Sequence, residues 1–186
     1  YRKFRFLVPA SYDGSEPWPL LFGWHWLNAS SGSFVRDGEL ESAVEEMNML
    51  VVLFDDLENA DGESIYWFNW PFSPTPPSTA EARLKEMTFF DDLLTCISQQ
   101  YNVDPCRVHA VGVSAGGLWL TYLSTTDRVD HLASIEVLSG GLAEIPLQLW
   151  HMEYFAQANK FPALVLWGGP LDIIPPINFN TASQRY

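Results

Sequence analysis

The segment that most constrains this chain is residues 108–117, which read Val-His-Ala-Val-Gly-Val-Ser-Ala-Gly-Gly. An apolar, strand-like run leads into Gly112-x-Ser114-x-Gly116, and an apolar stretch of helical length follows. This order is the sequence form of a nucleophile elbow, a sharp strand-to-helix turn that exposes a serine hydroxyl. Such a serine has a strained backbone, and the glycines provide room for the close approach. The pattern predicts Ser114 as a nucleophile and the Ala115 N–H, at a helix N-terminus, as a donor to an oxyanion.

The five-residue pattern alone also fits an ordinary tight turn, so the flanking elements carry the prediction. Apolar runs predict strands at residues 1–9, 18–24, 49–54, 108–113, 132–138 and 162–167. Helical spacing predicts helices at about residues 38–48, 79–101 and 118–123, with a loop at 25–33. Alternation of helices with continuously apolar strands predicts an α/β fold, with a mostly parallel sheet flanked by helices. The 186 residues are enough for a single domain.

Several polar candidates follow predicted strands directly. These are His25-Trp26, Ser114, the Ser-Gly-Gly run at 139–141, and Asp172. In open α/β sheets, ligands bind at the carboxyl ends of the strands. We therefore expect these residues to form one site.

Asp172 has two competing interpretations. An Asp shortly after Gly-Gly-Pro is also an ordinary turn residue. A rival acid is the pair Asp55-Asp56 at the end of another strand, which we interpret as a solvated strand end. The position of Asp172 after a strand, on the expected side of the sheet, favours it as the functional carboxylate.

Together these segments resemble the α/β-hydrolase superfamily, and within it the secreted esterases grouped with polyhydroxybutyrate depolymerases and feruloyl esterases. The matching segments are residues 7–13, the strand that ends at His25, residues 101–117, residues 139–141 and residues 168–172. The resemblance covers nearly the whole chain and implies one catalytic domain over residues 1–186. It implies Ser114 as nucleophile and Asp172 as triad acid. His25 would open the oxyanion loop, with a second N–H from Trp26 or its neighbour.

The catalytic histidine departs from that pattern. In this superfamily the histidine follows the acid, and residues 173–186 contain none. Serine is a weak nucleophile without an adjacent base. We therefore expect the chain to be cut before its last strand and helix, which would leave the fold incomplete at its C-terminus.

The four histidines present have other expected places. His25 belongs to the oxyanion loop, His109 is a core residue within a strand, and His131 is a surface residue. His151 alone stands in a segment free enough to allow it to reach the site.

The long loop at residues 57–79 is rich in aromatic residues and prolines, and loops of this length are usually functional. Trp67 and Trp70 form either a hydrophobic flap or a wall for an apolar or aromatic acyl group. With His25 they are the predicted substrate-binding residues. The expected activity is carboxylic-ester hydrolysis through an acyl-enzyme on Ser114, and the resemblance leans to polymeric esters or plant phenolic esters. The alternative is a non-catalytic binding domain that uses Trp26, Trp67 and Trp70.

Composition restricts the partners. The chain has 10 basic and 23 acidic residues, a formal charge of -13. This charge disfavours nucleic acid and anionic membranes. No apolar run approaches the roughly 18–20 residues that span a bilayer. The expected partner is a small or polymeric ester, no cofactor is required, and the oligomeric state stays open.

Cys96 and Cys106 flank the turn that leads into the elbow strand. They either form a disulfide, which we favour, or are two buried free thiols. A disulfide would indicate an oxidising compartment and agrees with the secreted or periplasmic location that the resemblance implies. The absence of Cys-x-x-Cys and of a nearby histidine argues against a metal site.

Overall fold

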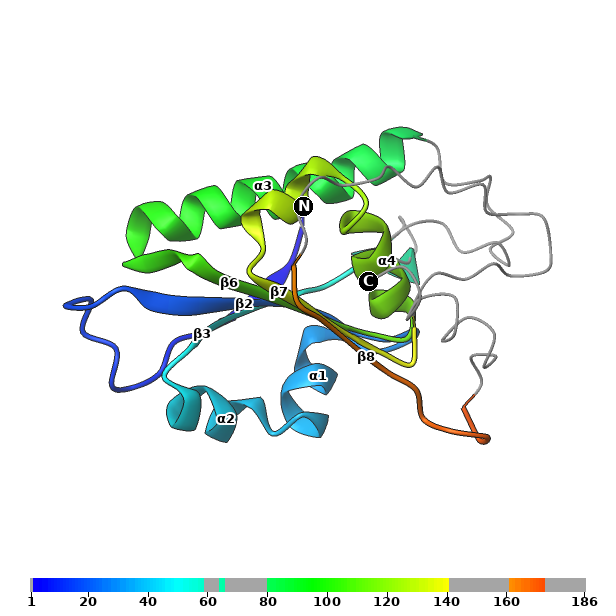
Figure 1. Ribbon diagram of the computed structural model, residues 1–186, viewed down its shortest axis with the longest axis horizontal. Coiled ribbons are helices and arrows are strands. Elements are labelled where there is room, and N and C mark those ends of the chain that lie inside the picture. The colour runs from blue at the N-terminus through cyan, green and yellow to red at the C-terminus, as the bar shows by residue number, and fades with distance from the viewer. Residues whose placement is uncertain (1, 59–63, 66–79, 141–160, 173–186) are drawn as a thin grey trace.

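A computed structural model describes residues 2–58, 64–65, 80–140 and 161–172 (Figure 1). Its main sheet has six strands: β1 (Phe4–Leu7), β2 (Trp18–Trp24), β3 (Leu50–Phe54), β6 (Val103–Val113), β7 (Ser134–Leu138) and β8 (Ala163–Leu166). The strand order is β1-β3-β2-β6-β7-β8, in which β1 is antiparallel to β3 and every other pair is parallel. A two-stranded pair, β4 (Leu57–Glu58) and β5 (Ser64–Ile65), is separate. The mostly parallel α/β sheet predicted from the sequence is confirmed.

Helices cover both faces of this sheet (Figure 1). The long helix α3 (Ala80–Gln100) and the elbow helix α4 (Ala115–Leu123) lie on one face, and α1 (Ser31–Asp37) and α2 (Leu40–Met47) lie on the other. A short 3-10 helix, η1 (Asp127–His131), connects α4 to β7. The sheet is therefore the middle of three layers, and its buried strands are apolar on both faces, as their sequences require.

An aromatic cluster packs the sheet against α3. Trp24 stacks on Phe54 with ring centroids 4.5 Å apart, and Phe22 meets Phe90 of α3 edge-on at 5.0 Å. All four rings are buried. Aromatic pairs of this kind contribute about 0.5–1.5 kcal/mol each beyond the area that they bury. The cluster holds the end of β2 firmly, directly before His25.

The strand register brings the carboxyl ends of five strands to one edge of the sheet. The residues paired at these ends are Phe54, Trp24, Gly112, Val113, Leu138 and Leu166. Because the strands are parallel, the residues that follow each of them emerge at this same edge. The predicted site residues after β2, β6, β7 and β8 all follow these ends.

Helix α1 differs from the loop predicted at residues 25–33. It begins at Ser31, and the Ser30 side chain caps it by accepting a hydrogen bond from the Ser33 N–H at 3.1 Å. Serine is a favoured N-cap residue because its oxygen satisfies an N–H that lacks a partner in the first turn. A run of small polar residues therefore contains a helix start rather than a continuous loop.

The predicted disulfide is wrong, because Cys96 and Cys106 are both free and exposed. The Cys96 sulfur accepts a hydrogen bond from the Gln100 side chain at 3.0 Å, one turn further along α3. Neither thiol is buried, so the alternative of two buried thiols is also wrong. The two cysteines therefore give no indication of an oxidising compartment.

Within the described ranges, no helix is both long and apolar enough to cross a membrane.

Candidate active site

Ser114 occupies the turn between β6 and α4 in a strained conformation. Its backbone has φ 52° and ψ −113°, outside the regions that a residue with a side chain ordinarily adopts. Its N–H donates to the Leu138 carbonyl of β7 at 2.8 Å, and its carbonyl accepts from the Leu118 N–H of α4 at 2.9 Å. Such strain persists only where the surrounding structure overdetermines it, and it concentrates at functional sites.

Backbone packing around the serine explains the glycines of the motif. A Cβ atom on Gly112 would lie 2.4 Å from the Gly116 carbonyl oxygen. One on Gly116 would lie 2.1 Å from the Trp24 carbonyl oxygen and 2.7 Å from that of His25. These distances exclude any side chain at either position. They also place the first turn of α4 directly against the backbone at the end of β2.

The neighbouring strand approaches the serine equally closely. A Cβ atom on Gly140 would lie 3.0 Å from the Ser114 carbonyl oxygen and 2.9 Å from the Gly117 Cα. Ser139, directly before it, has φ 47° and donates its N–H to the Leu166 carbonyl of β8 at 2.8 Å. The segment after β7 therefore packs against the elbow, as the sequence predicted from strand ends. Gly140 was not singled out as a close packing partner of the serine.

The electrostatics at the elbow favour negative charge. Ala115 is the first residue of α4, and the first N–H groups of a helix have no partner within it. The helix dipole adds partial positive charge at the same point. Ala115 is buried, so its N–H acts where water screens it little. This arrangement suits an oxyanion that develops beside Ser114.

The residues after β2 form a tight turn next to the elbow. The Trp26 carbonyl accepts hydrogen bonds from His25 Nδ1 at 2.8 Å and from the Ala29 N–H at 3.2 Å. Asn28 takes the left-handed conformation that this turn requires, with φ 59°. A carbonyl can only accept, so Nδ1 carries the proton of His25. The His25 side chain is buried and holds the turn; its contact with substrate stays a prediction.

The two residues after His25 have side chains on opposite faces of the sheet. Trp26 packs beside Phe34 of α1 with ring centroids 6.0 Å apart, and Leu27 packs against the core under α3 and α4. The Trp26–Leu27 peptide is trans, so the Leu27 N–H points opposite to the bound Trp26 carbonyl. The backbone N–H of Trp26 or Leu27 as second oxyanion donor stays a prediction, while the indole of Trp26 packs against α1.

Asp172 lies in the turn after β8. Its Oδ2 accepts a hydrogen bond from the Gly168 N–H at 2.8 Å, and its own N–H donates to the Gly169 carbonyl at 3.0 Å. Gly169 has φ 85°, a conformation that favours glycine. One carboxylate oxygen is therefore fixed by its own turn at the edge of the sheet where Ser114 lies.

Asp55, the rival acid, is engaged elsewhere. Its two carboxylate oxygens accept hydrogen bonds from the N–H and the hydroxyl of Ser31, at 2.7 and 2.9 Å. Asp55 is half-buried rather than solvated, so its interpretation as a solvated strand end is wrong. The sequence carried no local signal for this contact, because the two residues are 24 positions apart.

Two other histidines, His109 and His131, lie within the described ranges. His109 Nδ1 lies 2.8 Å from the Ser134 hydroxyl across β6 and β7. Burial, aided by the positive charge of Arg107, lowers the pKa of His109. His109 lies four residues before Val113, the last residue of β6, a separation of roughly 13 Å at the usual rise. His131 is exposed at the end of η1.

Some predicted residues lie outside the described ranges. Trp67 and Trp70 of the aromatic loop, His151 and Gly141 are all in this group. Their roles stay predictions.

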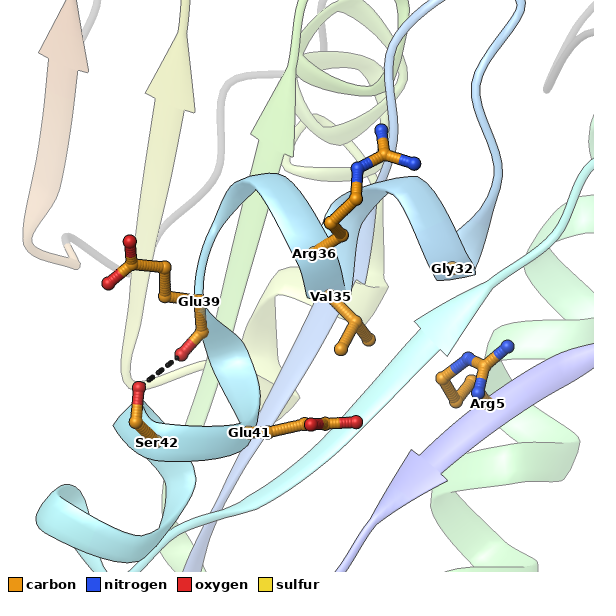
Figure 2. A pocket seen from close by; sticks show the side chains of 7 residues that line it. All are labelled: Arg5, Gly32, Val35, Arg36, Glu39, Glu41 and Ser42. Atoms are coloured by element: carbon orange, nitrogen blue, oxygen red, sulfur yellow. Dashed lines mark hydrogen bonds between the residues drawn. The ribbon is translucent and has the colours of Figure 1, made fainter.

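A separate polar groove of about 490 Å³ lies on the face covered by α1 and α2 (Figure 2). Two arginines and two glutamates line it with Gly32, Val35 and Ser42; the charged residues are Arg5, Arg36, Glu39 and Glu41. Opposite charges balance there, and none of the predicted site residues lines it. The residues that the structure describes contain no group of three or more acidic, histidine or cysteine side chains able to hold a metal ion.

The mostly parallel sheet, the serine elbow between β6 and α4, and the turn after β8 that carries Asp172 together define an α/β-hydrolase fold. Solved structures agree. The S-formylglutathione hydrolase from Agrobacterium tumefaciens superposes with a TM-score of 0.69 at 18% identity, over 97% of this chain and 76% of that one.

In sequence, the chain is similar to feruloyl esterases. It is 24% identical to a probable feruloyl esterase C of Aspergillus niger over 143 residues, which are 76% of this chain and 47% of that protein. The corresponding protein of Aspergillus terreus is 24% identical over 144 residues, with the same coverage. The chain thus spans about half the length of the curated relatives it matches. No protein-family model matches it.

Proposed function

We propose that this chain carries the nucleophile of a serine carboxylic-ester hydrolase. The single observation that carries the proposal is the backbone of Ser114, held at φ 52° and ψ −113° at the N-terminus of α4. A domain that only binds ligands has no need of a strained serine beside unpaired helix N–H groups.

In the first half of the reaction, the Ser114 hydroxyl attacks the ester carbonyl carbon and a histidine takes the hydroxyl proton. The carbonyl oxygen becomes an oxyanion, which accepts hydrogen bonds from the Ala115 N–H and from the N–H of Trp26 or Leu27. When the tetrahedral intermediate collapses, the alcohol leaves with the proton that the histidine returns to it. Ser114 then carries the acyl group as an ester.

In the second half, water attacks the acyl-enzyme while the same histidine accepts a proton from it. Collapse releases the carboxylic acid and restores the Ser114 hydroxyl. Asp172 accepts a hydrogen bond from the histidine and stabilises its positive charge. The proposed reaction requires no cofactor.

The base is a histidine. His25 lies next to the elbow, but its Nδ1 donates to the Trp26 carbonyl and holds the turn after β2, so we propose another histidine as the base. Two candidate sources are His151 and, as the superfamily order of serine, acid and histidine favours, a histidine outside residues 1–186. A His151→Ala variant separates them, because full activity in that variant leaves only the second source.

The substrate class is an ester of a phenolic acid or a polymeric ester, and the similarity to feruloyl esterases supports the former. We also propose, on the resemblance alone, that the protein works outside the cytoplasm. Trp67 and Trp70 are the proposed wall for the aromatic acyl group.

The proposed function is tested by hydrolysis of p-nitrophenyl acetate and methyl ferulate by the full-length protein and its Ser114→Ala variant. We expect the variant to lose about 10⁶-fold in kcat, the scale seen when a triad nucleophile is removed. Ser11→Ala, an exposed serine near Asn48, is the matched control and keeps full activity. Preference for the ferulate ester supports the phenolic class.

Two outcomes contradict the proposal. Hydrolysis that persists in Ser114→Ala would show that another group is the nucleophile. A folded wild-type protein that hydrolyses neither ester would favour the alternative of a binding domain with an aromatic surface.

A further inference from the structure

Asp55 is placed beside the turn that holds the proposed oxyanion donors. It follows β3 directly, just as His25 follows β2, and the last residues of these strands, Phe54 and Trp24, pair with each other. Asp55 and His25 therefore emerge side by side at the edge of the sheet that carries Ser114.

The Asp55 carboxylate holds one residue at two points. Oδ1 accepts from the Ser31 N–H at 2.7 Å and Oδ2 accepts from the Ser31 hydroxyl at 2.9 Å. Ser31 is 3% exposed, so both hydrogen bonds are shielded from water. Hydrogen bonds to an ionised carboxylate are shorter and roughly twice as strong as neutral ones.

Asp55 is itself fixed from the other side. Its N–H donates to the Lys3 carbonyl at 3.1 Å, and its carbonyl accepts from Arg2 Nη2 at 3.3 Å. The carboxylate is thus anchored to the strand layer and cannot simply follow Ser31 if the loop moves.

Residues 26–30 are consequently fixed at both ends. At one end, the backbone of Trp24 and His25 packs against Gly116 of the elbow. At the other, Ser31 is held by Asp55. Between these points, the two hydrogen bonds to the Trp26 carbonyl orient its peptide group. A short loop fixed at both ends has few conformations, so releasing one end frees the N–H groups of Trp26 and Leu27 to move.

We propose that Asp55 is a positioning residue for ester hydrolysis, which aims the backbone N–H of Trp26 or Leu27 at the oxyanion by holding Ser31. This inference rests on the proposed function. Asp55 touches no reacting atom and acts only through the loop. Its loss should therefore lower kcat and leave KM nearly unchanged, since the oxyanion exists only after substrate has bound.

The test compares two substrates that differ in one atom: p-nitrophenyl acetate and its thiono analogue, whose carbonyl oxygen is replaced by sulfur. Sulfur accepts N–H hydrogen bonds poorly, so the ratio of the two kcat/KM values reports how well the donors are aimed. Misfolding lowers the active fraction for both substrates equally and leaves that ratio unchanged.

We expect Asp55→Ala in the full-length protein to lose about 10- to 100-fold in kcat on the oxygen ester, since a misplacement of about 1 Å is worth up to about 10²-fold. The oxygen-to-sulfur ratio should fall several-fold. Asp55→Asn, which retains the shape, and Ser31→Ala, which removes only one of the two contacts, should show the same changes to a smaller extent. Asp37→Asn is the matched control, because that exposed carboxylate of α1 pairs with Arg36 on the surface.

An unchanged ratio in Asp55→Ala and in Ser31→Ala would overturn the positioning role and leave Asp55 a purely structural residue. Ser114→Ala is measured in the same series. If hydrolysis persists in it, the proposed function and the inference both fail; if hydrolysis is lost there while the ratio stays constant in the Asp55 variants, only the inference fails.

Discussion

Two turns lie at the same edge of one sheet but are held in different ways. They are the serine turn, which carries Ser114, and the acid turn, which carries Asp172. The serine turn sits between central strands, and the backbones of β2 and β7 come within contact distance of it. The acid turn follows β8, an edge strand of the described sheet, and its Leu171 is 95% exposed. Hydrogen bonds to Gly168 and Gly169 hold it.

This difference has an energetic meaning. Repulsion between atoms rises steeply as they approach each other. The glycines beside Ser114 therefore cannot carry a side-chain atom without displacing the backbone. A hydrogen bond contributes only about 0.5–1.5 kcal/mol net, so the acid turn can adjust without unfolding the protein. We therefore expect atoms added at the glycines of the serine turn to destroy folding and activity together, and changes at the acid turn to affect activity alone.

The largest effect is expected for Gly116→Ala. Its Cβ would lie 2.1 Å from the Trp24 carbonyl oxygen, so the elbow and β2 must separate. The free energy of unfolding should fall by about 3 kcal/mol or more, and hydrolysis should fall below detection. Chemical denaturation and p-nitrophenyl acetate hydrolysis check both.

The control for that change is Gly32→Ala in α1, whose Cβ would meet the flexible end of Arg5 at 3.4 Å and the Ser30 hydroxyl at 3.6 Å, an ordinary contact distance. We expect it to gain up to about 1 kcal/mol from the better helix propensity of alanine. Near-native stability in Gly116→Ala would show that backbone packing does not hold the serine turn.

The next effect is expected for Asp172→Asn. The amide oxygen can still accept from the Gly168 N–H, so the fold should be unchanged. The amide cannot stabilise a charged histidine, and we expect kcat to fall by about 10³–10⁴-fold, the scale of such a change in known triads. Steady-state kinetics beside a thermal melt measure both quantities. Wild-type kcat would assign the acid to another carboxylate.

A smaller effect is expected for Gly168→Ala. The added Cβ would lie 3.0 Å from Asp172 Oδ2, which can yield by a few tenths of an ångström because it ends a side chain. We expect kcat to fall about tenfold while the free energy of unfolding changes by less than about 1 kcal/mol.

Gly14→Ala, in a distant loop with φ 73°, should have the opposite effect to Gly168→Ala, a loss of stability without a loss of activity. It should lose about 1–2 kcal/mol to backbone strain and keep its kcat. Equal behaviour of the two variants would show that Gly168→Ala acts through backbone strain rather than through the position of Asp172.

The smallest effect is expected for His109→Gln on the elbow strand. Burial and Arg107 lower the pKa of His109 in the folded protein, so the unfolded chain binds more protons as the pH falls below 6.5. Wild-type stability should therefore fall as the pH is lowered through that range, by at most about 1.4 kcal/mol per pH unit. The stability of His109→Gln should lack this part of the pH dependence.

Urea midpoints at pH 7.5 and 5.5 measure the difference. His131→Gln, at an exposed histidine, is the control and should keep the wild-type pH dependence. Parallel pH profiles for the wild type and His109→Gln would contradict the expectation.

The sequence allowed prediction where the physical cause is local. The elbow was predictable because close backbone contacts leave no room for a side chain at Gly112 and Gly116. These contacts come from residues a few positions away and from the end of one neighbouring strand. The strands were predictable because burial on both faces leaves continuous apolar runs. Their parallel arrangement then implied a shared edge for the residues after them.

Other features depend on contacts that no local pattern encodes. Helix α1 has seven residues and starts within small polar ones, so its apolar stripe is too short to stand out. The hydrogen bonds of Asp55 to Ser31 join two elements through the tertiary fold. The predicted disulfide failed because closeness in sequence does not fix where the Cys96 side chain on α3 lies relative to Cys106 on β6.

The most direct test of the central claim is covalent labelling of Ser114. The full-length protein is treated with a fluorophosphonate, which reacts with activated serines, and the adduct is located by peptide mass spectrometry. Our account predicts one phosphonyl group per chain, on Ser114, with hydrolytic activity lost in proportion to labelling. A folded protein that stays unlabelled, or one that is labelled elsewhere while Ser114 remains unmodified, would contradict it.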